Sequence, residues 1–171
     1  MRAAFVGLAL VVALALQTTV SRYLPGIGSL DLVLVVVIYV ALSFGPVPGL
    51  LAGTVGGLAQ DVLSGGIVGV GGLAKTIVGF VAGVIGMQFI VAQALPRFLV
   101  FFCATVVQAG CFFGLYAMLE PALSTTYTAV FWQALANALV GILAFQARDF
   151  APGVMERRRT AGTYVRTRRL E

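Results

Sequence analysis

The chain has 171 residues, of which 60% are hydrophobic and 10% are charged, and it contains no histidine. A soluble domain carries about a quarter charged residues, so the composition excludes a water-exposed surface and indicates a membrane protein. The absence of histidine excludes Ser-His and Cys-His catalysis and imidazole metal sites. Few enzyme chemistries remain, and we expect no catalytic residue, no metal and no cofactor, with catalysis by carboxylates kept as an alternative below.

Six apolar runs follow one another along the chain. The first covers residues 3–20, follows Arg2 and contains the A-x-A-like segment Ala13-Leu14-Ala15, which is typical of a signal peptide. Because Met1 is present, we interpret this run as an uncleaved first span. The other runs cover residues 32–44, 50–62, 73–95, 98–119 and 128–147. We expect an all-helical integral membrane protein with six transmembrane helices.

The second and third runs are short, and the turn Gly45-Pro46-Val47-Pro48-Gly49 separates them. Each run gives roughly 20 Å of helix, which is less than the ~30 Å hydrocarbon core. One kinked helix from residue 31 to residue 62 would reach roughly 48 Å, too long to span without strong tilt. We therefore favour a hairpin of two short helices over residues 31–62.

The distribution of arginines predicts the topology. Of the eleven Lys and Arg residues, seven lie in residues 148–171. Such a cluster beside a final span is held in the cytoplasm. We expect it to bind anionic lipid of the inner leaflet rather than nucleic acid. Six spans then place both termini in the cytoplasm of a bacterial inner-membrane protein. Five spans would exchange the sides of Arg2 and Arg22, and the charge rule alone barely separates the two alternatives.

The chain divides into one transmembrane domain, residues 1–147, and a cytoplasmic arginine-rich tail, residues 148–171. We expect the last span to end at Arg148 and Asp149. Pro152-Gly153 should then open the tail.

Glycines at helical spacing form rows in the middle of the chain. Gly49, Gly53 and Gly57 are spaced by four, and Gly79 and Gly83 repeat the spacing. Small residues at this spacing let helix backbones approach closely in lipid. The rows predict packing among the helices of this chain, with a face offered to another membrane protein as the alternative.

Two acids flank the hairpin, Asp31 before it and Asp61 at its end. Six spans place both acids at its outer ends, and Lys75 lies across a glycine-rich loop that includes Gly65. Ionisable groups near the membrane are candidates for function. We expect interfacial capping or an Asp61–Lys75 ion pair, with a partner contact or catalysis as alternatives. The motifs of intramembrane aspartyl proteases and lipoprotein signal peptidases are absent.

The order of these features resembles the family of the rod shape-determining protein MreD. The resemblance covers residues 30–86 and rests on four segments. They are Asp31-Leu32-Val33-Leu34, the turn and helix start from Gly45 to Gly53, Gly57-Leu58-Ala59-Gln60-Asp61-Val62-Leu63-Ser64-Gly65-Gly66, and Gly69 with Gly79-Phe80-Val81-Ala82-Gly83. The family-like positions are Asp31, Gly53, Gly57, Asp61 and Gly65.

The resemblance implies a non-enzymatic inner-membrane scaffold subunit of the bacterial cell-elongation machinery. Its partner would be an MreC-like periplasmic scaffold, linked to an MreB-type filament, a RodA-type glycan polymerase and a class B penicillin-binding transpeptidase. It also implies a fold like that of the substrate-binding subunits of energy-coupling factor transporters.

A small-molecule-binding subunit of a vitamin-type transporter is the alternative function. Ala9 and Ala13 could dock a transport partner, whereas the outer loops carry few polar groups to orient a small ligand. An intramembrane hydrolase would need a nucleophile–base pair that the sequence lacks.

Overall fold

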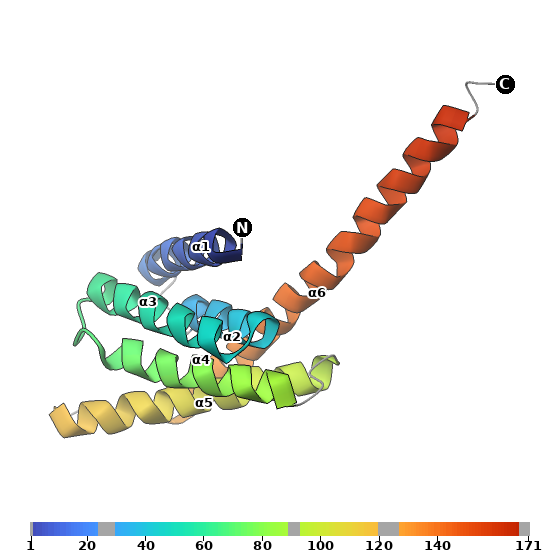
Figure 1. Cartoon of the computed structure of the whole chain (residues 1–171). Helices are drawn as coiled ribbons and strands as arrows, with labels where there is room; N and C mark the ends of the chain where they lie inside the picture. Colours follow the sequence, from blue (N-terminus) through green and yellow to red (C-terminus); the bar gives the residue numbers. More distant parts are fainter. Residues whose placement is uncertain (1, 24–29, 89–92, 120–126, 168–171) are drawn as a thin grey trace.

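The computed structural model describes residues 2–23, 30–88, 93–119 and 127–167, and the regular structure in these ranges is helical (Figure 1). The helices are α1 Arg2–Tyr23, α2 Leu32–Phe44, α3 Pro46–Ser64, α4 Val70–Gln88, α5 Ala94–Leu119 and α6 Tyr127–Thr167. Three segments are long and apolar enough to cross a membrane, Val70–Gln88, Ala94–Leu115 and Thr128–Arg148, and two shorter apolar helices cover Ala4–Thr19 and Leu32–Phe44.

Helix α2 coincides with the predicted run, whereas α3 begins at Pro46, so four of the five residues of the predicted turn 45–49 are helical. A proline is favoured in the first turn of a helix, which explains this difference. The break expected between the runs 73–95 and 98–119 is misplaced, because α4 ends at Gln88 and α5 begins at Ala94, with Pro96 in its first turn. A proline is tolerated there, since the first backbone N–H groups of a helix have no partner within it.

The expected break at Pro152-Gly153 is also wrong. Helix α6 continues without interruption to Thr167 and leads away from the bundle (Figure 1). A proline inside a helix removes one backbone hydrogen bond and kinks the helix without having to end it. The arginine-rich segment therefore continues the last span as a helix.

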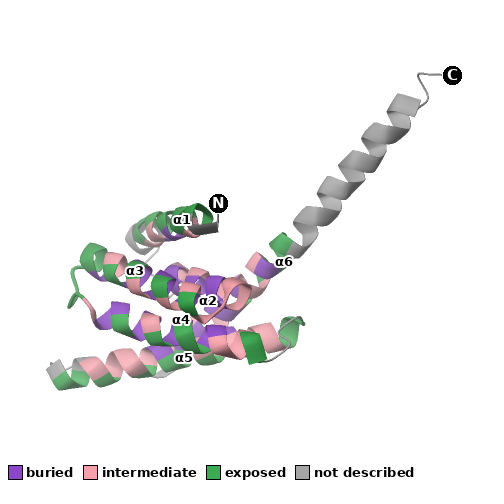
Figure 2. Ribbon diagram, in the orientation of Figure 1, coloured by how far each residue is buried: buried purple, intermediate pink, exposed green. Residues whose placement is uncertain are grey.

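Helix α2 occupies the centre of the bundle and contacts each of the other five helices. More than half of its residues are buried, among them Leu34 and Ile38 (Figure 2). They pack against Val78 and Ala82 of α4 and against Phe101 of α5. A helix that is apolar all round is expected to be buried, and α2 has this composition.

Helices α2 and α3 form the predicted hairpin. The turn between them is Gly45, whose φ of 99° is a conformation that L side chains rarely adopt. A Cβ atom on Gly49 would lie against Ala41, and one on Gly56 would contact Val33. Gly49 and Ala41 both lie near the turn, and Gly56 and Val33 both lie farther from it. Because the residues of each pair face each other, the two helices run antiparallel.

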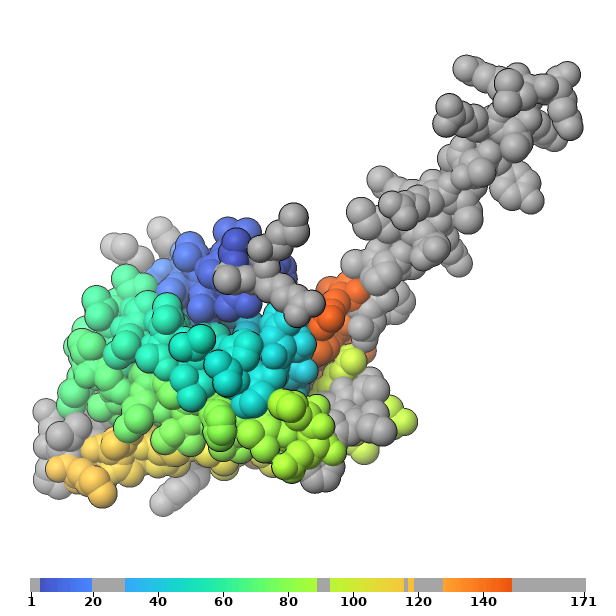
Figure 3. All heavy atoms as spheres, in the orientation of Figure 1, coloured from blue at the N-terminus to red at the C-terminus, as the bar shows by residue number. Residues whose placement is uncertain are grey.

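Helix α1 lies at one edge of the bundle, against α2 and α3 (Figure 3). Its N-terminal half borders an apolar groove of about 490 Å³. Gly7 of α1 and Phe44 and Pro48 of the hairpin line this groove. The N-terminal half of α1 is therefore level with the Gly45 turn.

The glycine rows bring α3 and α4 into backbone contact. A Cβ atom on Gly53 would collide with the carbonyl group of Lys75, and one on Gly57 would collide with Gly72. Gly49 and Gly79 face each other in the same way, with the backbone of one helix against the other. The row on α3 is thus turned towards α4 and packs inside this chain.

We predict that Gly53→Leu strongly destabilises the bundle, because a side chain there must push α3 away from α4. Overpacking costs about 1–3 kcal/mol, and in lipid no hydrophobic gain offsets the lost contacts. Gly110→Leu is the matched control, since a Cβ atom at Gly110 meets nothing within 4 Å. Unfolding by denaturing detergent, with membrane abundance measured alongside, tests this. Equal stability of the two variants would contradict close packing at Gly53.

Candidate functional site

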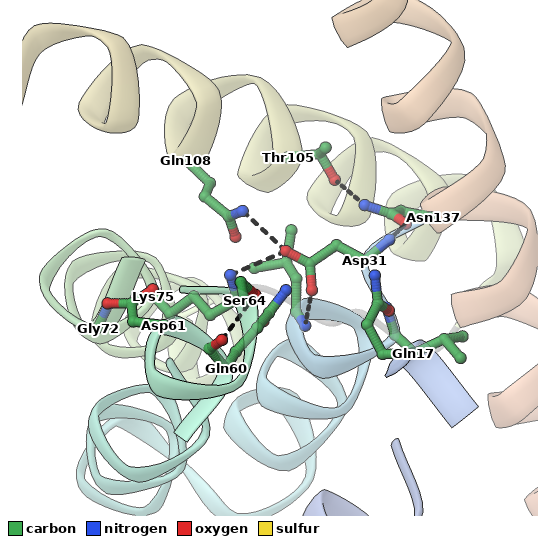
Figure 4. A network of polar contacts seen from close by, with 12 residues as sticks. Gln17, Asp31, Gln60, Asp61, Ser64, Gly72, Lys75, Thr105, Gln108 and Asn137 are labelled. Carbon is green, nitrogen blue, oxygen red and sulfur yellow. Dashed lines mark hydrogen bonds and ion pairs between the residues drawn. The ribbon is translucent and has the colours of Figure 1, made fainter. Parts of the chain in front are cut away.

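A buried ion pair lies in the middle of the bundle. The Nζ atom of Lys75, in the second turn of α4, is 2.8 Å from Oδ2 of Asp31, and both side chains are buried (Figure 4). The predicted Asp61–Lys75 pair is therefore wrong. Helices α2 and α4 run parallel, with Val37 against Gly79 and Leu42 against Gly86. This arrangement brings the start of α2 level with the first turns of α4.

Asp31 lies at the end of α2 opposite the Gly45 turn, where α5 and α6 contribute polar side chains. Gln108 of α5 donates a hydrogen bond from Nε2 to Oδ2 of Asp31, at 2.9 Å. Asn137 of α6 accepts a hydrogen bond from the backbone N–H of Asp31, at 3.0 Å, and donates one to the Thr105 hydroxyl, at 3.3 Å. Thr105, Gln108 and Asn137 lie near the middle of the two segments that are long enough to cross the membrane. The ion pair is thus level with the central part of these two segments of α5 and α6.

Side chains satisfy the backbone at the start of α2. Oδ1 of Asp31 accepts the N–H of Leu34 at 3.0 Å, and Oε1 of Gln17 accepts the N–H of Leu32 at 2.8 Å. The Gln17 amide also donates to the carbonyl oxygen of Leu30 at 2.6 Å. A helix that begins inside the membrane needs such partners, because no lipid group replaces water there. Gln17 of α1, Asn137 of α6 and the side chain of Asp31 itself supply them.

Two structural roles were expected for Asp61, capping or an ion pair with Lys75. The structure shows capping. Its Oδ2 atom accepts backbone hydrogen bonds from Gly69 at 2.9 Å and from Gly72 at 3.1 Å, at the start of α4. Gly65 ends α3 in the left-handed conformation that favours glycine. The glycine-rich loop thus turns the chain from α3 into α4, and Asp61 closes the turn.

A cavity of about 500 Å³ lies beside the ion pair, between α3, α4, α5 and α6. Its polar lining includes Asp31, Gln60, Asp61, Ser64, Lys75, Gln108 and Gln133, and its apolar lining includes Phe112, Phe113 and Val130. We expected few polar groups to be available for a small ligand, because only the residues of the outer loops were considered. The polar groups that line this cavity lie mainly on helices.

Two buried amide oxygens of the cavity wall have no hydrogen-bond partner among the described residues, Oε1 of Gln60 and Oε1 of Gln108. Both side chains point towards the Asp31–Lys75 pair (Figure 4). A buried acceptor without a donor costs about 1–3 kcal/mol. The cavity is therefore the place where water or a ligand would find unused hydrogen-bonding capacity.

Gln17, Gln108 and Asn137 form hydrogen bonds between helices, and sequence reasoning named none of them as a site residue. It did not connect any of them with Asp31. The signal was available, since each of these amides interrupts an apolar run and a polar residue in a membrane helix usually faces the bundle interior. Which amide meets which acid depends on helix depth and rotation, and an apolar run specifies neither.

We predict that Lys75→Met lowers the free energy of unfolding by about 3–5 kcal/mol, because it leaves the Asp31 carboxylate buried without its partner. The double variant Asp31→Asn with Lys75→Met should recover part of this loss. Arg148→Met removes an exposed cation and should cost about 1 kcal/mol or less. Detergent unfolding of all three variants tests the assignment. Equal losses for Lys75→Met and Arg148→Met would refute it.

The model of one protein family, described as rod shape-determining protein MreD, matches residues 1–147. Searches of curated proteins and of solved structures gave no match. The likeness in fold to energy-coupling factor subunits therefore stays a prediction. The match covers α1 to α5 and the first part of α6, including all contributors to the Asp31 network. The chain therefore belongs to the MreD family of rod shape-determining membrane proteins.

Proposed function

We propose that the protein is a non-enzymatic inner-membrane scaffold of the bacterial cell-elongation machinery and that it holds the membrane helix of an MreC-like periplasmic partner. Membership of the MreD family implies a role in rod shape determination. The observation that carries the finer proposal is an unoccupied face of small residues on α5. Through its partner the protein would be linked to a RodA-type glycan polymerase, a class B penicillin-binding transpeptidase and an MreB-type filament.

The glycine rows of α3 and α4 are not free to receive the partner, because they face each other. Of the three long apolar segments, the one in α5 is the most exposed. Only 17% of it is buried inside the bundle, compared with 50% of the segment in α4. A partner helix would gain most contact area on α5.

The exposed face of α5 carries small residues at coiled-coil spacing. Cys103, Val107, Gly110, Gly114 and Ala117 are all exposed and are spaced alternately by four and three. Cβ atoms on Gly110 and Gly114 would meet nothing within 4 Å. Small residues in such a stripe let a second helix approach closely, which drives helix association in lipid.

The stripe continues into an apolar groove of about 220 Å³ between α4 and α5. Leu99, Cys103 and Val107 form the α5 side of this groove, and Val81 and Ile85 belong to its α4 side. Stripe and groove together offer a single helix a path along α5. We name this path, defined by the stripe and the groove, the α5 face.

Gly110→Leu should abolish capture of an MreC-like partner while leaving membrane abundance unchanged, because a leucine there holds the partner helix away from α5. Gly7→Leu is the matched control, since Gly7 also faces open space, on the α1 groove. Co-purification of the co-expressed partner from native membranes measures capture. Loss of capture with Gly7→Leu but not with Gly110→Leu would place the partner on the α1 groove.

The position of the cationic residues supports six spans with both termini in the cytoplasm. Arg148 donates a hydrogen bond to the Ser43 hydroxyl at 3.0 Å, next to the Gly45 turn. The guanidinium of Arg97 lies 4.4 Å from the centre of the Phe145 ring. The N-terminal half of α1 is level with the same turn. Three basic segments therefore lie at one end of the bundle, as expected for a cytoplasmic end.

A reporter that fluoresces only in the cytoplasm, fused after Glu171, should be bright, because the arginines beside α6 are held on the cytoplasmic side. They would also attract anionic lipid there. The same reporter inserted after Gly66, in the loop at the opposite end of α3, should be dark. A stable but dark fusion at Glu171 would overturn the six-span topology.

The cavity beside Asp31 favours a second candidate function, the small-molecule-binding subunit of a vitamin-type transporter. A cavity of this size is within the range of ligand sites. Partner identification separates the two functions. A shape-determining scaffold should co-purify with an MreC-like protein, and its gene should lie beside the gene of that protein, whereas a transporter subunit should co-purify with ATPases.

A further inference from the structure

The cavity beside the ion pair opens towards the end of the bundle that lies opposite the arginines. Its wall includes Ser64 and Gly66, at the C-terminal end of α3, while the Gly45 turn lies at the other end of that helix. Its deep wall includes Asp31, Lys75 and Gln108. In the proposed topology it is a recess that leads from the outer surface to the middle of the membrane.

The recess contains hydrogen-bond acceptors and also a hydrogen-bond donor group. Oε1 of Gln108 and Oε1 of Gln60 are acceptors without a partner among the described residues, and Gln108 is only 8% exposed. An ammonium group carries three N–H donors, and the ion pair with Asp31 uses one of those on Lys75. Within the described part of the chain, two acceptors without a donor and the ammonium group of Lys75 therefore line the same recess (Figure 4).

The charged side chains that line the recess determine which class of molecule it can bind. An anion would lie close to the carboxylates of Asp31 and Asp61, and a cation would lie close to the ammonium of Lys75. An apolar molecule would leave both glutamine oxygens without donors, which is costly in a buried site. A hydroxyl group is neutral, donates to a glutamine oxygen and accepts from an ammonium.

We infer that the recess binds a neutral, polyhydroxylated group of about the size of a sugar, with its hydroxyls on Gln60, Gln108 and Lys75. The upper wall fits this class, because Phe112 and Phe113 are apolar surfaces above the polar groups. A volume of about 500 Å³ leaves space for such a group. The hydroxyls come either from a free sugar or from the head group of a lipid in the outer leaflet. This inference goes beyond the proposed scaffold role and does not involve the α5 face.

The test uses the full chain in nanodiscs of phosphatidylcholine, whose head group has no hydroxyl. Two photoreactive probes carry the same diazirine-bearing glucose. One is a methyl glucoside in solution, and the other is a glucosyl diacylglycerol in the disc. Saturable labelling, mapped by mass spectrometry to residues of the recess such as Phe113 or Gln133, is the expected result. Labelling by the first probe identifies a free ligand, and labelling by the second identifies a lipid head group.

Gln108→Leu and Gln60→Leu should each weaken the apparent affinity about tenfold, as expected for the loss of a buried hydrogen bond. Gln88→Leu is the matched control, because Gln88 is exposed at the far end of α4, and it should bind like the wild type. Gln60→Leu decides the outcome if Gln108→Leu fails to fold, since Gln108 also bonds to Asp31. Without saturable labelling of folded wild-type protein by either probe, or with equal affinity in all variants, the recess holds water only and the inference is wrong.

Discussion

The bundle depends on one interaction, the buried ion pair between Asp31, at the start of α2, and Lys75 of α4. A carboxylate and free backbone N–H groups are both costly in hydrocarbon. The structure meets this cost with an ammonium from α4 and amides from α1, α5 and α6. Each of these helices has to be at a fixed depth and rotation to reach Asp31. Their arrangement around α2 follows from this requirement.

The glycine contacts between α3 and α4 complement the polar network. Lys75 presents its side chain to Asp31 and its carbonyl group to Gly53 of α3. The residue that neutralises the buried acid therefore lies where the backbones of α3 and α4 are in contact. At the next residue of each helix, the hydroxyls of Thr54 and Thr76 are 2.8 Å apart and link the same two helices. Backbone contact and charge pairing thus fix the position of one helix, α4, from two sides.

The sequence was sufficient to predict what depends on neighbouring positions. The hairpin, the extent of α2 and the spacing of the glycines follow from local composition. The ion pair could not be predicted in this way. Lys75 is closer in sequence to Asp61 than to Asp31, but Asp61 is engaged by two backbone N–H groups of its own loop. The cavity depends on side chains from four helices, and no sequence pattern places such residues together.

The central position of α2 also affects how the protein is made. The ribosome delivers Asp31 to the membrane before Lys75, and Gln108 and Asn137 follow still later. Until Lys75 has been synthesised, the Asp31 carboxylate at the N-terminal end of α2 has no cation beside it, and an unpaired charge in hydrocarbon is costly. The polar contacts that hold the start of α2 are complete only after α6 has been synthesised, because Asn137 belongs to that helix.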